Sequence, residues 1–169
     1  MIAPTLTTDR LTLRALAPQD AEAFAAFYAD DRSSFVGGPM NAEQSWRTLA
    51  GEIGHWTLNG FGRWAVTETG SDTCIGCVGL WAPLGWPEPE IGWDLFEGAT
   101  GKGYATEAAE AARSYAYETL GWDTAISLVA IGNDASARVA TRLGCTPEGT
   151  FTHARLGTLT IYRHPKVGG

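Results

Sequence analysis

A glycine-rich turn before a helix-forming run, Gly98-Ala99-Thr100-Gly101-Lys102-Gly103, has the composition of a phosphate-binding site. A helix start presents unpaired N–H groups and the positive end of its dipole. Glycines let a phosphate approach the backbone because no Cβ stands in the way, and Lys102 adds a local cation. An ordinary strand-to-helix turn has the same composition, so the segment alone leaves phosphate binding and a simple turn both open.

Two well-known phosphate motifs do not fit this turn. A P-loop requires Lys-Ser or Lys-Thr after its final glycine, whereas Gly103 is followed by Tyr104. The dinucleotide fingerprint requires a third glycine where this chain has Thr106. A phosphorylated small molecule held by backbone N–H groups remains possible.

A second polar segment runs from Asn133 to Gly144 after a predicted strand. An Asn at a strand end can bond a bent backbone or a ligand amide. Arg138 and Arg142 stand four residues apart on one face of a predicted helix, within reach of a phosphate. A capped surface helix with solvated arginines explains the same spacing, and it is the preferred interpretation of the two arginines.

Strands and helices in alternation must position these segments. Period-two alternation predicts the strands, and apolar residues three or four apart predict the helices. The second helix is expected to place Trp46, Leu49, Ile53 and Trp56 on one side, and residues 30–40 are expected to form a loop. We predict a single mixed α/β domain over residues 1–169. The expected strands cover residues 10–14, 62–68, 73–82, 89–96, 124–130, 145–151 and 157–163, and the expected helices start at 18 and cover 42–58, 102–119 and 134–143.

Composition argues against several classes of function. The chain has 169 residues, 44% of them hydrophobic, and a net charge of −7, which argues against a nucleic-acid partner. No apolar run approaches the roughly 20 residues of a membrane span, and the N-terminus lacks a signal-peptide pattern. Three cysteines fit a reducing cytoplasm, so we expect a cytoplasmic protein. Cys74 and Cys77, three apart on a predicted strand, should point to opposite faces, and the scattered histidines predict no metal site.

Four segments together resemble the GNAT superfamily of N-acetyltransferases, in its RimJ/RimL-like branch. They occur in the expected order and spacing, and the likeness covers nearly the whole chain. They are Asp9 to Arg14, Glu90 to Trp93, Gly101 to Ala108 and Asn133 to Gly144. The resemblance implies a mixed, mostly antiparallel sheet splayed into a V with helices on both faces, and acetyl-CoA as co-substrate in the opening.

The resemblance also implies a donor site. Backbone amides of Gly101, Lys102, Gly103, Tyr104 and Ala105 would hold the pyrophosphate. The strand end at Leu95 and Phe96 would pair with the pantetheine arm, and the segment carrying Asn133, Ser136 and Arg138 would complete the site. Gly98 stands where the family often has Gln or Arg, so the backbone supplies most of that contact.

Catalysis in the family is direct attack of an amine on the acetyl carbonyl. An aliphatic ammonium has a pKa near 10 and must first lose a proton. Glu90 matches the family's frequent catalytic carboxylate, and its alternative is a solvated strand-edge residue; Asp94 and Glu97 are weaker candidates. Many relatives use a Tyr where this chain has Ala140, so Ser136 is the candidate acid for the leaving thiolate, and a helix-start hydroxyl is its alternative.

The acceptor is expected to be a small-molecule or peptide amine. Trp86 is a possible acceptor contact, Trp93 belongs to the core or the cleft floor, and Trp46 and Trp56 lie where the family shapes the acceptor site. No membrane partner is expected, and the chain is expected to be a monomer or homodimer. The alternative function is a GNAT-like module that binds acyl-CoA without catalysis.

Overall fold

A computed structural model describes residues 2–168 of the chain, which form an eight-stranded sheet in the order β1-β2-β3-β4-β5-β6-β8-β7. Neighbouring strands are antiparallel except β5 and β6, which are parallel and are paired at one position, Glu90 with Ile126. The strands are β1 (Leu6–Thr7), β2 (Leu11–Arg14), β3 (Arg63–Glu68), β4 (Gly76–Trp81), β5 (Glu90–Leu95), β6 (Ile126–Ala130), β7 (Thr146–His153) and β8 (Gly157–Arg163).

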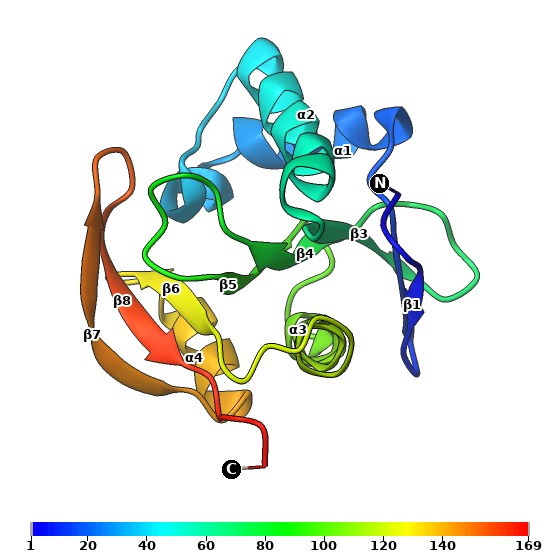
Figure 1. The fold of residues 1–169 in the computed structure, drawn as a ribbon. Helices are drawn as coiled ribbons and strands as arrows, with labels where there is room; N and C mark the ends of the chain where they lie inside the picture. The colour runs from blue at the N-terminus through cyan, green and yellow to red at the C-terminus, as the bar shows by residue number, and fades with distance from the viewer. Residues whose placement is uncertain (1, 169) are drawn as a thin grey trace.

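Helices cover both faces of this sheet. Figure 1 shows α1 and α2 on one side of the central strands and α3 and α4 on the other. The predicted mixed, mostly antiparallel sheet, splayed where β5 and β6 separate, is therefore confirmed. The helices are α1 (Ala21–Ala29), α2 (Ala42–Asn59), α3 (Tyr104–Ser114) and α4 (Asp134–Arg142), with the 3-10 helices η1 (Pro18–Asp20) and η2 (Asp31–Val36) and a π turn, η3 (Tyr115–Thr119).

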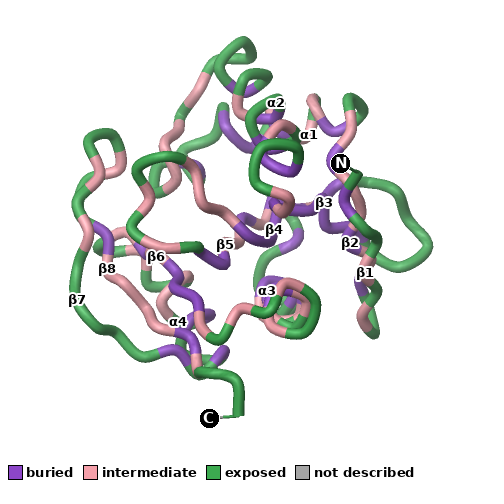
Figure 2. Tube along the Cα trace, in the orientation of Figure 1, coloured by how far each residue is buried: buried purple, intermediate pink, exposed green. Residues whose placement is uncertain are grey.

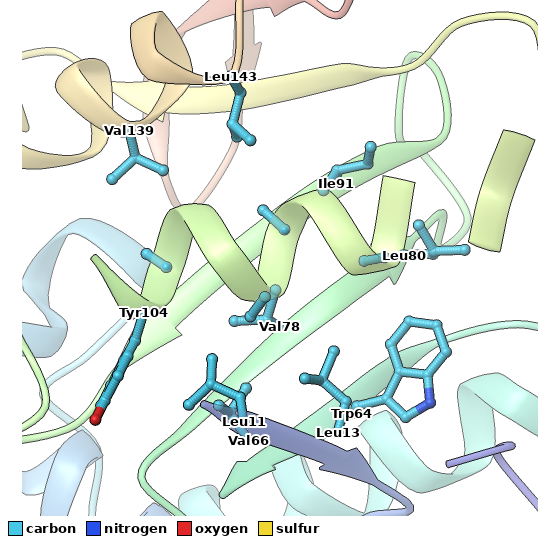
Figure 3. Close-up of a cluster of buried hydrophobic side chains, with 14 of the residues drawn as sticks. Leu11, Leu13, Trp64, Val66, Val78, Leu80, Ile91, Tyr104, Val139 and Leu143 are labelled. Atoms are coloured by element: carbon cyan, nitrogen blue, oxygen red, sulfur yellow. The ribbon is translucent and has the colours of Figure 1, made fainter. Parts of the chain in front are cut away.

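The main core lies between α3 and the sheet. Small residues on α3 let its backbone approach the strands closely, and Ala108, Ala109 and Ala112 are completely buried. Figure 3 shows the apolar side chains that surround this helix, which come from β2, β3, β4, β5 and α4. The buried stretches of the trace in Figure 2 concentrate on the central strands and the inner side of α3. This core fixes β5 and the start of α3 relative to each other.

Helix α2 differs from the sequence expectation. Leu49 and Trp56 are buried, but Trp46 is 64% exposed and Ile53 is 38% exposed. The buried side of α2 instead includes Glu52, which forms an ion pair with a strand residue. Hydrophobic periodicity missed this side because a carboxylate and its partner occupy it. Trp56 belongs to the core, where its Nε1–H donates to the Arg63 carbonyl, so it does not shape an acceptor site.

Two further expectations were wrong. Residues 30–40 contain η2 rather than an irregular loop, because the Asp30 side chain accepts the Arg32 N–H and starts a turn. Cys74 and Cys77 lie in one apolar cluster instead of on opposite faces, because β4 begins at Gly76 and Cys74 precedes it. The prediction of one domain over residues 1–169 stays a prediction.

Candidate active site

The separation of β5 from β6 leaves one edge of β5 without a partner strand. The Phe96 N–H donates to Ile75 on the β4 side, and the Ile91 carbonyl accepts from the Ser127 hydroxyl on the β6 side. Backbone groups alternate in direction along a strand. Therefore the N–H groups of Trp93 and Leu95 point into the opening, where both residues line a groove.

This first groove has a volume of about 950 Å³ and extends to the start of α3. The first hydrogen bond of α3 joins the Glu107 N–H to the Gly103 carbonyl, and no side chain caps this helix start. Gly101 and Gly103 have φ values of 76° and 81°, a left-handed backbone that favours glycine. The N–H groups of the first turn are thus available to an anion, and phosphate binding at this turn stays a prediction.

Three side chains that line the groove bear on whether a phosphorylated ligand fits. Thr106 lines it, and the buried Thr106 Oγ1 has no hydrogen-bond partner among the described residues. Arg138 also lines it, with no ion-pair partner in the described part of the chain. Glu107, a carboxylate beside the helix start, is bonded to Thr8 and Arg10. An orphaned hydroxyl, an unpaired guanidinium and open N–H groups fit a phosphorylated ligand.

Two of the residues predicted for the donor site, Phe96 and Lys102, do not line the groove. The Phe96 ring stacks on Phe27 in the core, and its N–H is already bonded to Ile75, so neither group reaches the groove. Lys102 is exposed and does not line the groove; its carbonyl accepts a hydrogen bond from Arg10. Leu95, Gly101, Gly103, Tyr104, Ala105, Asn133, Ser136 and Arg138 all line it.

A second cavity of about 370 Å³ lies on the other side of the β5 edge. It is walled by η2, α2, the 83–86 connection and the turn between β7 and β8. Trp93, Asp94, Asn133 and Ser136 line both spaces, so the groove and the cavity meet there. Two molecules, one in each space, would approach each other at this junction.

Glu90 lies in the second cavity and is only 8% exposed. Its carboxylate accepts from the Leu128 N–H at 2.7 Å and from Trp86 Nε1 at 3.1 Å. Burial raises the pKa of Glu90 to about 7, and these two donors oppose the rise. A carboxyl group with this pKa can exchange protons near neutral pH.

A buried ion-pair triad forms part of the same cavity and was missed by the sequence analysis. Arg63 donates to Glu52 through Nε and Nη2 and to Asp94 through Nη1 at 2.8 Å. All three side chains are nearly inaccessible. Pairing offsets the desolvation cost of burying these three charges, and the triad keeps one net negative charge in the cavity wall. Tyr28 lies beside it, and burial raises the pKa of its hydroxyl.

The start of α4 forms the rest of the junction. The Asn133 side chain accepts the Ser136 N–H and caps this helix. Ser136 Oγ accepts from Trp93 Nε1 at 3.3 Å. Because the indole donates, the hydroxyl proton of Ser136 remains available to another group. Ala140, where the resemblance implied a Tyr in many relatives, is buried in the core.

A hydrogen-bond chain fixes the point where β5 and β6 separate. Arg113 donates to His164 Nδ1 at 3.2 Å, so a neutral His164 carries its proton on Nε2 and donates to Ser127 at 2.8 Å. Ser127 in turn donates to the Ile91 carbonyl at 2.6 Å. The pairing resembles a nucleophilic Ser–His dyad, but here the imidazole is the donor, so Ser127 is not activated. This series of hydrogen bonds has a structural role, because it connects β6 to β5 where the two halves of the sheet separate.

His164 predicts a pH dependence of stability. Burial lowers its pKa from 6.5 to about 3, so between these values the unfolded chain binds a proton that the folded protein does not. Folded stability therefore rises with pH across this window and falls as pH drops. We expect the free energy of unfolding of the wild type, measured in urea relative to a His164→Gln variant, to increase by about 1.4 kcal/mol per pH unit as the pH rises from 4 to 6. A pH-independent difference would contradict the assigned neutral imidazole.

No metal centre and no membrane span are found in the described part of the chain. Among residues 2–168, no three His, Cys, Asp or Glu side chains are arranged to hold a metal ion. None of the helices there is both long and apolar enough to cross a bilayer.

Comparisons with known proteins identify the family to which this fold belongs. A family profile described as an acetyltransferase (GNAT) domain matches residues 10–146. The uncharacterized N-acetyltransferase YoaA of Bacillus subtilis is 29% identical over 152 residues, covering 88% of this chain and 86% of YoaA. The crystal structure of an acetyltransferase from Agrobacterium tumefaciens aligns with a TM-score of 0.87 at 40% identity, over 97% of this chain and 95% of the other. That of RimL, a ribosomal L7/L12 alpha-N-protein acetyltransferase, aligns with a TM-score of 0.79 at 17% identity over 98% of this chain and 95% of the other, which is a likeness of fold.

Proposed function

The chain belongs to the GNAT acetyltransferase family, and we propose that it transfers the acetyl group of acetyl-CoA to a primary amine by direct attack of the nitrogen. The observation that carries this proposal is the meeting of two spaces at Trp93, Asp94 and Ser136. One space ends at an uncapped helix start, and the other contains a carboxyl group that titrates near pH 7. A donor and an acceptor can thus meet with a proton acceptor close by.

The donor is assigned to the larger groove. Backbone N–H groups from Gly101 to Ala105 and the hydroxyl of Thr106 would hold the pyrophosphate, with Arg138 as a nearby cation. The free edge of β5 at Leu95 and the Asn133 segment would flank the pantetheine arm. When bound, acetyl-CoA supplies an electrophilic thioester carbonyl. Phe96 is left out of this assignment because its N–H and its ring are both engaged elsewhere, and Lys102 takes part only through its backbone N–H because its side chain does not line the groove.

The acceptor ammonium loses two protons in the reaction. Glu90 takes the first, directly or through a water, so that the nitrogen lone pair can form the new C–N bond. As the C–S bond breaks, Ser136 gives the departing thiolate a proton from its free hydroxyl, and the second proton of the nitrogen restores that hydroxyl. A thiol with a pKa near 8.5 is already a fair leaving group, so this second contribution is the smaller of the two.

The proposal is tested by following release of the free CoA thiol. Acetyl-CoA is mixed with the protein and a panel of primary amines, amino acids and short peptides. We expect saturable, amine-dependent thiol release. Saturable CoA binding without release on any acceptor would instead support the alternative, a binding module that has lost its chemistry. A cytoplasmic location, and a monomeric or homodimeric state, stay predictions.

A further inference from the structure

The geometry of the second cavity points to the chemical class of the acceptor. We propose that it is a small primary amine that carries an apolar or aromatic group and no carboxylate next to the nitrogen. Its nitrogen would lie over Gly92, between Glu90 and Asp94. This inference rests on the proposed function and narrows it.

Gly92 leaves a space beside Glu90 and Arg63, at the strand position between Glu90 and Asp94. Side chains alternate along a strand, so Glu90, Gly92 and Asp94 share one face of β5, and all three line the cavity. A Cβ built on Gly92 would stand 3.6 Å from Arg63 Nη1 and 3.7 Å from Glu90 Oε1. These are ordinary contact distances, so a methyl group would fill the space without a clash. Asp94 Oδ2 is bonded to Arg63, while Asp94 Oδ1 has no hydrogen-bond partner among the described residues.

The charges around this space favour a cation and disfavour an anion. Glu52, Glu90 and Asp94 line the cavity, and Arg63 is the cation among them. Its Nε, Nη1 and Nη2 groups donate to Glu52 and Asp94, so its positive charge is already matched by two carboxylates, and with Glu90 the carboxylates around this space outnumber the guanidinium three to one. Like charges in a buried site repel strongly because the effective dielectric is low.

A free α-amino acid would bring a further carboxylate into this space. Its carboxyl carbon is two bonds from the nitrogen, so a nitrogen over Gly92 places the carboxylate within a few ångströms of Glu90 and Asp94. The other cation of the cavity, Arg155, is exposed on the turn between β7 and β8 and so belongs to the rim. The pocket therefore distinguishes amines by the group next to the nitrogen.

Aromatic side chains form the walls. Trp81, Trp86, Trp93 and Phe35 line the cavity, and the Trp86 ring packs at 5.4 Å from the His153 ring. A cavity of about 370 Å³ suits a small molecule. Aromatic walls next to the carboxylates of Glu52, Glu90 and Asp94 match an amine whose remaining portion is apolar or aromatic.

Three acceptors that share one phenethylamine skeleton test the inference, two of them of equal size. Phenethylamine, phenylalaninamide and phenylalanine differ in the group next to the amine: hydrogen, a neutral amide and a carboxylate. We expect kcat/KM from thiol release, corrected for the fraction of neutral amine, to be at least about 30-fold lower for phenylalanine than for the other two. Equal or faster turnover of phenylalanine would overturn the inference and leave the proposed function standing. An Arg155→Ala variant that abolished this turnover would identify a carboxylate site at the rim instead.

A Gly92→Ala variant tests where the nitrogen lies. The added methyl should raise the KM for phenethylamine at least about tenfold and leave the KM for acetyl-CoA unchanged. Gly51→Ala is the matched control, because Gly51 lies on α2 with nothing within 4 Å of its added Cβ. An unchanged amine KM in Gly92→Ala would rule out this placement.

A binding measurement covers the case in which no amine releases thiol, which would mean that the proposed function fails. The three wall tryptophans report occupancy through their fluorescence. Quenching by phenethylamine but not by phenylalanine would support the inference for binding, and equal or absent quenching by both would overturn it.

Discussion

Replacing Glu90 with glutamine is expected to lower kcat/KM for the amine by at least about tenfold, with the affinity for acetyl-CoA nearly unchanged. Glutamine has the same shape, and its carbonyl can still accept a hydrogen bond from Leu128 or Trp86. It cannot take a proton. Because Glu90 lies in the acceptor cavity and outside the donor groove, the loss should appear in turnover and not in CoA binding.

The pH profile of the same variant is the sharper measurement. With a pKa of about 7 for Glu90, wild-type kcat/KM should fall below pH 7 as the carboxylate becomes protonated. The Gln variant should lack this limb while keeping any rise at higher pH that reflects deprotonation of the amine. Wild-type activity of Glu90→Gln across pH 6 to 9 would remove Glu90 from the mechanism.

The Glu90→Gln variant should lose activity but gain stability at pH 8. The pKa of Glu90 is higher in the folded protein than its ordinary value of 4.5, so between pH 4.5 and 7 the folded state binds the extra proton. Stability from this group is complete below pH 4.5 and is lost as pH rises through 7. At pH 8 the buried charge costs roughly 3 kcal/mol, and Glu90→Gln removes that cost. We expect the variant to be more stable than wild type at pH 8 and little changed at pH 4 in urea unfolding, whereas a purely structural Glu90 would give a less stable variant at both.

Local signals in the sequence were sufficient for the fold and for the helix start that lines the larger groove. The glycine turn, the alanine stripe of α3 and Asn133 each act through neighbouring backbone, so their spacing alone predicts a helix start and its cap. Phe96 and Lys102 show the limit of this reasoning. Their positions along the chain are correct for the motif, but tertiary packing directs one side chain into the core and the other into solvent.

The acceptor cavity was less accessible to sequence analysis. Glu52, Arg63 and Asp94 come from α2, β3 and β5, and no short spacing links them. These residues can pair only when α2 lies across the sheet as it does here. The ion pairs in turn help to hold α2 in that position. The alternation Glu90-x-Gly92-x-Asp94 was a usable signal. It places two carboxylates and a vacant position on one face of a strand, a pattern that ordinary core strands lack.

Valine at position 103 is expected to weaken acetyl-CoA binding at least about tenfold. Gly103 has a φ of 81°, which costs a β-branched residue roughly 1 to 2 kcal/mol, and its added Cβ would stand 3.4 Å from Arg10 Nη2. Relief of that strain must rotate the peptide units at the start of α3. The N–H groups assigned to the pyrophosphate would then no longer converge, and the branched side chain would block approach to them.

Gly121→Val separates this local effect from general strain. Gly121 lies beyond the other end of the same helical segment with a φ of 75°, it has nothing within 4 Å of its added Cβ, and it does not line the groove. Both variants should lose comparable stability in urea unfolding, but in calorimetry Gly103→Val alone should lose CoA affinity. Wild-type affinity in Gly103→Val would place the pyrophosphate elsewhere. Equal losses in both variants would mean that the groove responds to any strain in α3, and that the N–H groups of its first turn are not the specific donors.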